Sequence, residues 1–295
     1  MTRTQKIAHA PMTLEDFRFS LGNGNWEYFA RTGVSLDDIY ASTADWAAAL
    51  EGVDRPWLCW NVNPDWNLVQ QRMVKSVGWT PVVGFDPRVG PPPVEPGSIL
   101  IDFNARLKLP TMWMPFPMEF VHRFAPRMAF WHADLLIPEQ KMRRIAVMFE
   151  ALPDGHVIAA KPDTGIRDVF NAKGRRYWDL VGCTTRAASQ DAFDKGAGWW
   201  MSFANHPSNS PEQRKRRAAY FWDTGTGIHY WHKQLGGQVS TIPEAYVKDG
   251  HFTGIGQKQY HRVSPRNHKR DLTRELSLNY HLVDCCRQLG LEEYL

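Results

Sequence analysis

The chain has 295 residues, of which 43% are hydrophobic, so it carries enough apolar material for one large α/β core. Its 35 basic and 31 acidic side chains leave a formal charge of +4, which favours anionic ligands, but nucleic acid is not expected as a partner. The four cysteines form no metal or disulfide pattern, and no apolar run is long enough for a membrane span. The first residues lack the apolar core of a signal peptide, so we expect a cytoplasmic protein.

The first 54 residues are predicted to form a helical extension. Helical patterns cover residues 13–20 and 36–51. Ser35 is a candidate N-cap for the second helix, and Gly52 stands just past its end.

From Pro56 the pattern changes to short apolar runs separated by helical segments, which is typical of βαβ units. Residues 55–262 are therefore predicted to form the main domain. The expected strands are 56–62, 80–85, 98–103, 127–132 and 156–160, and the expected helices are 65–77, 116–124 and 138–151. This alternation predicts a mostly parallel sheet flanked by helices, with ligands bound at the carboxyl ends of the strands.

The remaining third of the chain has a less regular pattern. The expected elements are helices at 211–221 and 224–235, a strand at 238–247, and a helical tail over 263–295. The basic run 214–217 is interpreted as a solvated helix face, with contact to a diphosphate or an anionic glycan as the alternative.

An apolar strand that ends in His-Ala-Asp is the clearest candidate site. Residues 127–131 lead directly into His132 and Asp134. Alternate residues of an extended chain share one face, so both side chains can face the same ion or phosphate. A hard cation such as Mn²⁺ or Mg²⁺ held there would offset charge on a diphosphate. The alternative is a hydrogen-bonded histidine beside an aspartate that caps the next helix.

This segment resembles the strand–DxD element of GT-A fold glycosyltransferases, in which Asp-x-Asp binds the metal and the diphosphate of a nucleotide-sugar. His132 stands in place of the first aspartate, so the resemblance implies Asp134 as the main metal ligand, with His132 assisting. Residues 182–199 are similar to the acceptor-side block of that fold, a glycine-rich turn followed by a short helix. Ser189 is expected to cap this helix and Gly196 to end it.

Further blocks are similar to the same family. Asp223 precedes a helix, glycines and a strand, and the resemblance implies that it is the general base beside the acceptor hydroxyl; the alternative is a helix cap. His251 corresponds to a late histidine that completes the metal site. The same resemblance also places Asn61, Asn63 and Asp86, together with Asp134, around the nucleotide.

The resemblance covers roughly residues 55–255 and implies a GT-A-like α/β enzyme. Its expected activity is hexosyl transfer from a nucleotide-sugar donor to a glycan or small-molecule acceptor, as in polysaccharide biosynthesis. Two alternatives stay open. One is a metal-dependent hydrolase built on His132, Asp134 and further histidines. The other is a non-catalytic protein of the same fold, in which some of the 13 tryptophans hold a carbohydrate.

Overall fold

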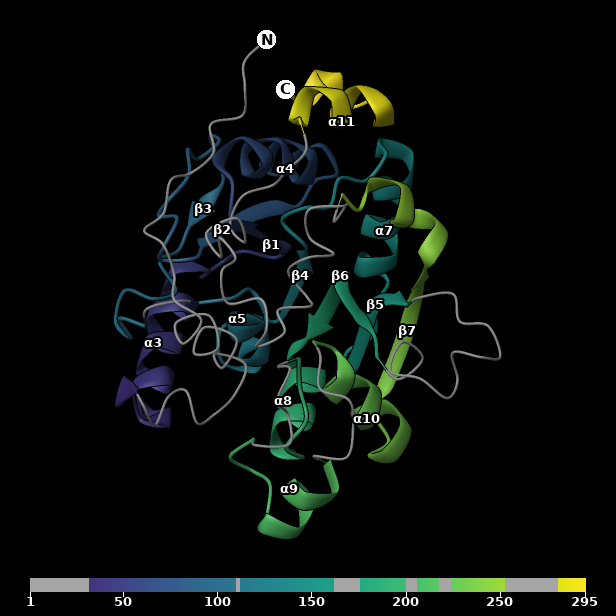
Figure 1. The fold of residues 1–295 in the computed structure, drawn as a ribbon. Coiled ribbons are helices and arrows are strands. Elements are labelled where there is room, and N and C mark those ends of the chain that lie inside the picture. The colour runs from purple at the N-terminus through teal and green to yellow at the C-terminus, as the bar shows by residue number, and fades with distance from the viewer. Residues whose placement is uncertain (1–31, 110–111, 162–175, 200–205, 218–223, 253–280) are drawn as a thin grey trace, which may run out of the picture.

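A mixed seven-stranded sheet organises the protein, with the strand order β3-β2-β1-β4-β6-β5-β7 (Figure 1). The computed structural model describes residues 32–109, 112–161, 176–199, 206–217, 224–252 and 281–295. The strands are β1 (Pro56–Asn61), β2 (Thr80–Phe85), β3 (Ile99–Leu100), β4 (Arg127–Trp131), β5 (His156–Lys161), β6 (Trp178–Thr185) and β7 (Gln238–Pro243). The expectation of an α/β fold with a mostly parallel sheet is confirmed at this level.

Strand β6 is the reversed strand of the sheet. β1 runs parallel to β2 and β4, β2 runs parallel to β3, and β5 runs parallel to β7. β6 is antiparallel to both of its neighbours, β4 and β5. The start of β6 therefore lies beside the carboxyl end of β4, where the backbone N–H of His132 donates to the Leu180 carbonyl over 2.8 Å.

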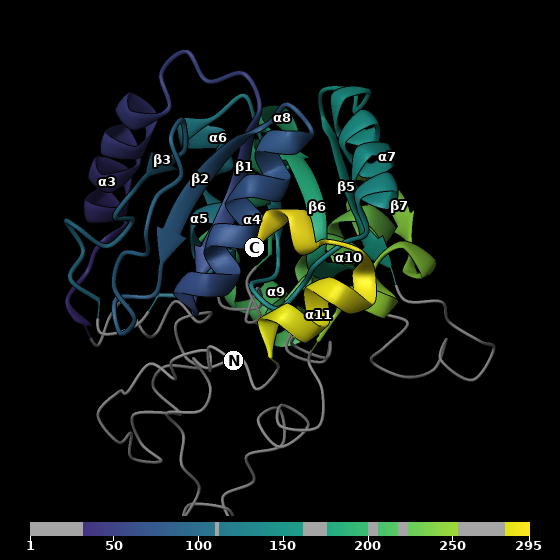
Figure 2. The ribbon, with the colours of Figure 1, turned by 90° about the horizontal axis from the view of Figure 1, so that it is seen from above.

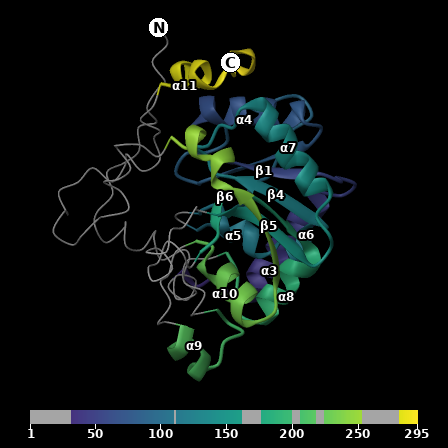
Figure 3. The same ribbon diagram turned by 90° about the vertical axis from the view of Figure 1, so that its right-hand side faces the viewer.

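Helices pack on both faces of the sheet, and each face has its own hydrophobic core. Figures 1 and 3 show α4, α7 and α11 on one side and α3, α8 and α10 on the other. The helices are α3 (Leu36–Ala49), α4 (Pro64–Ser76), α5 (Pro115–Glu119), α6 (Val121–Phe124), α7 (Glu139–Glu150), α8 (Arg186–Asp194), α9 (Pro211–Arg217), α10 (Thr226–Gln234) and α11 (Leu282–Leu289). The 3₁₀ turns are η5 (Glu244–Tyr246), η6 (Lys248–Gly250) and η10 (Glu292–Tyr294). Alternation along β1 divides its side chains between the two cores, with Leu58 and Trp60 in one and Trp57 and Cys59 in the other.

Helix α3 and the C-terminal residues 281–295 pack against the sheet domain. The predicted Ser35 cap is confirmed, because its hydroxyl accepts from the Asp38 N–H while the Asp38 carboxylate accepts from the Ser35 N–H. Trp46 of α3 contacts the ring of Phe103 at a centroid distance of 5.0 Å, so α3 shares the core of the sheet. At the other end, Arg72 of α4 donates to the carbonyl of Tyr294, and Figure 2 shows this C-terminal segment beside α4.

Several predicted boundaries are wrong. Residues 182–185, expected to begin a glycine-rich turn, belong to strand β6 instead. Thr185 is the N-cap of α8, and Ser189 lies inside that helix, so the predicted Ser189 cap is wrong, whereas Gly196 has the expected left-handed conformation with φ 64°. Three further elements are shorter than predicted. β3 has only 2 residues, the expected 116–124 helix is interrupted at Phe120, and the last strand ends at Pro243. The predicted helix at 13–20, the last residues of the predicted main domain (253–262) and residues 263–280 of the tail lie outside the described residues.

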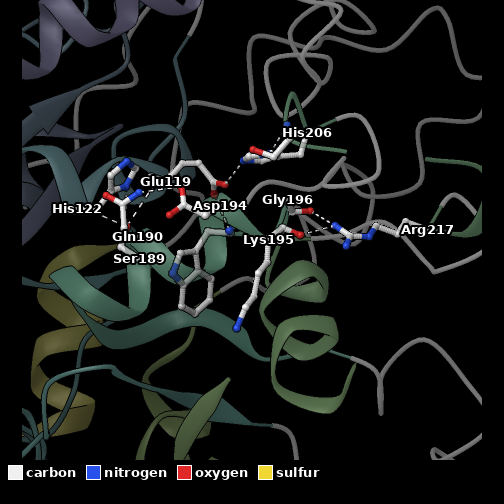
Figure 4. A network of polar contacts seen from close by, with 11 residues as sticks. Glu119, His122, Ser189, Gln190, Asp194, Lys195, Gly196, His206 and Arg217 are labelled. Carbon is white, nitrogen blue, oxygen red and sulfur yellow. Dashed lines mark hydrogen bonds and ion pairs between the residues drawn. The ribbon is translucent and has the colours of Figure 1, made fainter. Parts of the chain in front are cut away.

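A buried polar network holds residues 195–199, which follow α8 (Figure 4). Glu119 is 3% exposed and accepts from the backbone N–H of Trp199 over 2.8 Å, while its other oxygen lies 3.5 Å from Nε2 of His206. Arg217 is 2% exposed and donates to the backbone carbonyls of Lys195 and Gly196. The interpretation of the basic run as a solvated face is therefore wrong for Arg217, although residues 214–216 are exposed.

His122, at the edge of this network, makes folding stability depend on pH. Burial, followed by the charge of Arg123, lowers its pKa to about 4. The unfolded chain therefore binds this proton more tightly, and stability falls as the pH drops from about 6.5 toward 4, by about 2 kcal/mol between pH 6.5 and 5. In denaturant unfolding at pH 7 and 5, His122→Phe is expected to lose less stability than the wild type. Equal losses in the two proteins would contradict this assignment.

Candidate metal centre

Three residues predicted as metal ligands lie together beyond the carboxyl end of β4. His132, Asp134 and His251 each offer a ligand atom, and these atoms all lie within 4.8 Å of one another. The Asp134 Oδ1 atom lies 3.3 Å from Nδ1 of His132 and 3.6 Å from Nε2 of His251. The side chain of Asp134 is 8% exposed, whereas those of His132 and His251 are 33% and 22% exposed, so the carboxylate is the most buried part of the cluster.

Two ligand atoms of this cluster lack hydrogen bonds. Oδ1 of Asp134 and Nε2 of His251 are buried, and neither makes a hydrogen bond within the described part of the chain. Leaving a buried polar atom without a hydrogen bond costs about 1–3 kcal/mol, so such atoms call for an explanation. A cation among the three side chains would satisfy both atoms, and the residues present therefore fit a metal ion.

Backbone pairing brings His251 to the turn after β4. His251 and Leu135 form an antiparallel bridge. The N–H of Leu136 donates to the carbonyl of Gly250, and the N–H of Phe252 donates to the carbonyl of Asp134, each over 3.0 Å. This pairing fixes the histidine relative to Asp134 although the two residues are far apart in the sequence.

Gln70 of α4 holds the same turn through two hydrogen bonds. Its side-chain amide donates to the carbonyls of His132 and Leu135 over 2.8 Å and 2.9 Å, and the residue is 0% exposed. Gln70 could not be predicted as part of the site, because a glutamine within an amphipathic helix carries no signal of its distant partners.

Asp179, the second residue of β6, was also missed. Its Oδ2 atom lies 2.9 Å from Nε2 of His132, so the two nitrogens of the His132 ring each face a carboxylate. Burial opposes the charged ring, but without a bound metal Asp179 and Asp134 together raise the pKa of His132 to about 10, so a metal ion that binds Nδ1 displaces a proton from it. Burial likewise opposes the ionised form of Asp134, yet His132 and His251 hold the pKa of that carboxyl well below its usual range.

The donor set indicates which ions suit the cluster. Two imidazoles and one carboxylate are typical ligands of Mn²⁺, Fe²⁺ and Zn²⁺, whereas Mg²⁺ prefers oxygen ligands in an octahedral arrangement. Of the two ions expected from the sequence, Mn²⁺ therefore fits these side chains better than Mg²⁺.

The residues predicted to contact the nucleotide lie at the carboxyl ends of β1 and β2, on the same edge of the sheet as His132. Asn61 is 0% exposed and donates to the Gly90 carbonyl, and its side-chain oxygen makes no hydrogen bond among the described residues. Asn63 caps α4 by accepting from backbone N–H groups of the first turn. Asp86 is 1% exposed and pairs with Arg88 over 2.8 Å. Asp223, the predicted base, lies outside the described residues.

Comparison with known proteins gives no match to a family model, to a curated protein or to a solved structure. In the described ranges, no helix has both the length and the apolar character needed to cross a membrane. The function is therefore inferred from the chemistry of the chain's own residues.

Proposed function

We propose that this chain is a metal-dependent glycosyltransferase with a GT-A-like fold, which transfers a hexose from a nucleotide-sugar to a glycan or small-molecule acceptor. The observation that carries the proposal is the convergence of His132, Asp134 and His251. The resemblance of the His-Ala-Asp segment to a DxD element, together with that of His251 to a late histidine of the same family, implies the same three ligands. The cluster lies at the carboxyl end of a central parallel strand, where ligands of α/β sheets bind.

In this proposal His132, Asp134 and His251 hold a Mn²⁺ ion, which supplies positive charge to offset that of the leaving diphosphate. The resemblance assigns Asn61 and Asp86 to the base and ribose of the donor, but both side chains are buried and bonded within the protein, so the proposal does not depend on their contacting the nucleotide. Asp223 is assigned as the base that accepts the proton of the acceptor hydroxyl. The acceptor oxygen then forms a bond to the anomeric carbon as the bond to the diphosphate breaks.

Thermal unfolding with nucleoside diphosphates tests the proposal. A nucleotide at 100 times its Kd stabilises the native state by about 2.7 kcal/mol, which corresponds to a rise in Tm of about 5 °C. This rise is expected for one nucleotide in the presence of Mn²⁺ and is expected to disappear with chelator. If none of the common nucleoside diphosphates raises the Tm, the proposal is contradicted.

The set of metal ligands also favours a second candidate, a metal-dependent hydrolase. Two histidines and one carboxylate form the ligand set of hydrolytic zinc sites. Purified protein that retains zinc or iron and hydrolyses esters without any response to nucleotides would favour this function over sugar transfer.

The carbohydrate-binding alternative gains no support from the tryptophans. Most of the described ones fill the two cores, namely Trp46, Trp57, Trp60, Trp66, Trp79, Trp131, Trp199 and Trp231. A buried indole offers no face to a sugar ring, so these residues act in packing.

A further inference from the structure

Asp179 contacts the ring nitrogen of His132 that points away from the metal cluster. His132 faces Asp134 through Nδ1 at 3.3 Å and faces Asp179 through Nε2 at 2.9 Å. The second distance is that of a charge-assisted hydrogen bond, and the first is longer than such a bond. The ring is therefore held mainly from the Asp179 side.

A histidine that binds a metal does so through one nitrogen and donates the N–H of the other nitrogen to a carboxylate, a carbonyl or water. Asp179 is placed to accept from Nε2–H, which leaves Nδ1 to face Asp134 and the cluster. The resulting order, carboxylate, imidazole and then metal, fixes both the tautomer and the orientation of the ring.

The sheet topology places Asp179 at this position. Because β6 runs opposite to β4, its first residues lie beside the carboxyl end of β4. The backbone hydrogen bond from His132 to Leu180 links the two chains at this point, so the ring and the carboxylate are carried by adjoining segments. The side chain of Asp179 is only 15% exposed, which limits its freedom to turn away.

Asp179 is not itself among the clustered ligands. Among the described residues, the group whose ligand atoms lie within 4.8 Å of one another contains His132, Asp134 and His251 only. A role that acts through His132 therefore explains its position better than direct coordination does.

We propose that Asp179 is a positioning residue that holds His132 with Nε2 protonated and Nδ1 directed to the metal. This inference rests on the proposed metal site, but not on the identity of the nucleotide or the reaction. It predicts that the carboxylate contributes to metal affinity without contacting the ion.

Calorimetric titration of the full chain with Mn²⁺ alone, and separately with Zn²⁺ alone, tests the role of Asp179. Asp179→Ala is expected to weaken the binding of both ions by roughly 10- to 100-fold, as for other outer-shell partners. Asp179→Asn retains an acceptor oxygen and is expected to restore part of the affinity. Asp249→Asn is the matched control, since Asp249 is 56% exposed and pairs with Lys141 rather than with the cluster. This variant should bind both metal ions as tightly as the wild type does.

A spectroscopic readout separates positioning from a general loss of structure. In the Zn²⁺-loaded wild type, ¹⁵N–¹H correlation spectra of the imidazoles should show His132 protonated at Nε2, with the signal assigned by its loss in His132→Gln. This tautomer should be lost in Asp179→Ala and kept in Asp179→Asn. If Asp179→Ala fails to fold, the spectrum and metal affinity of Asp179→Asn test the inference instead. Protonation of His132 at Nδ1 in that variant, or complete loss of its metal binding, would overturn the inference.

The outcomes distinguish this inference from the proposed function. Wild-type metal binding that Asp179→Ala leaves unchanged would overturn the role of Asp179 and leave the glycosyltransferase proposal standing. Metal binding that depends on Asp179, in a protein that ignores nucleotides, would support the positioning role and overturn the glycosyltransferase. Failure of the wild type to bind either ion would overturn both.

Discussion

Asp134→Ala is expected to abolish specific binding of Mn²⁺ and Zn²⁺, with a loss of affinity greater than roughly 100-fold, which exceeds the effect of an outer-shell residue. Asp134 is the residue that both histidines face, at 3.3 Å and 3.6 Å. Removing its carboxylate leaves two imidazoles without the negative charge between them. Calorimetry with each ion measures the loss directly.

The control for this variant is another carboxylate from the segment that pairs with the turn. Asp249 precedes Gly250, and its side chain contacts Lys141 at 3.4 Å. Asp249→Ala should bind metal like the wild type and unfold at a similar temperature. If Asp134→Ala and its control bind metal equally well, the cluster is not the metal site.

Gly250→Ala is expected to lower the free energy of unfolding by about 3 kcal/mol and to weaken metal binding at least roughly tenfold. A Cβ atom at this position would lie 1.6 Å from the carbonyl oxygen of Leu136 and 2.8 Å from its carbonyl carbon. These are backbone atoms, so no side-chain rotation relieves the clash. The segment carrying His251 must then move away from the turn that carries Asp134.

Gly236→Ala is the comparison for this glycine. Nothing lies within 4 Å of a Cβ at Gly236, although its φ of 81° is unfavourable for alanine. This variant is therefore expected to lose about 1 kcal/mol of stability while it retains metal affinity. Denaturant unfolding and metal titration of both variants make the comparison, and wild-type metal affinity in Gly250→Ala would show that the close approach does not position His251.

Local signals allowed the first half of the fold to be predicted from the sequence. Ser35 and Asp38 form a capping box through contacts only three residues apart, so a short pattern contains all the information. β4 is an apolar run bounded by polar residues, and His132 and Asp134 of the turn that follows it lie beside one another, as their spacing predicts. The grouping of His132, Asp134 and His251 was expected from a resemblance that gave their order along the chain.

β6 was not predicted, because its strand character depends on its neighbours. Gly182 suggests a turn in the sequence, yet a Cβ at this residue would lie 2.5 Å from both the Ile158 carbonyl oxygen and the ring of Phe130. The glycine therefore allows β6 to pack closely between its neighbours β4 and β5. Without β6, the approach of Asp179 to His132 cannot be deduced from the sequence.

The supporting contacts of the site show the same limit. Gln70 contacts His132 and Leu135 across 62 and 65 residues of sequence, through packing of α4 on the sheet. Asp86 was expected to face the nucleotide, and the structure pairs it with Arg88 only two residues away. A polar residue at a strand end thus has several candidate partners, some local and some distant, and its own sequence context does not decide among them.

The most direct test of the central claim is calorimetric titration of the wild type and Asp134→Ala with UDP, GDP, CDP and dTDP, each with Mn²⁺ and again with chelator. A glycosyltransferase with its metal at His132, Asp134 and His251 should bind one of these nucleotides only with Mn²⁺, and Asp134→Ala should lose that binding. Nucleotide binding that persists with chelator or in Asp134→Ala, or no binding of any nucleotide, would contradict the account.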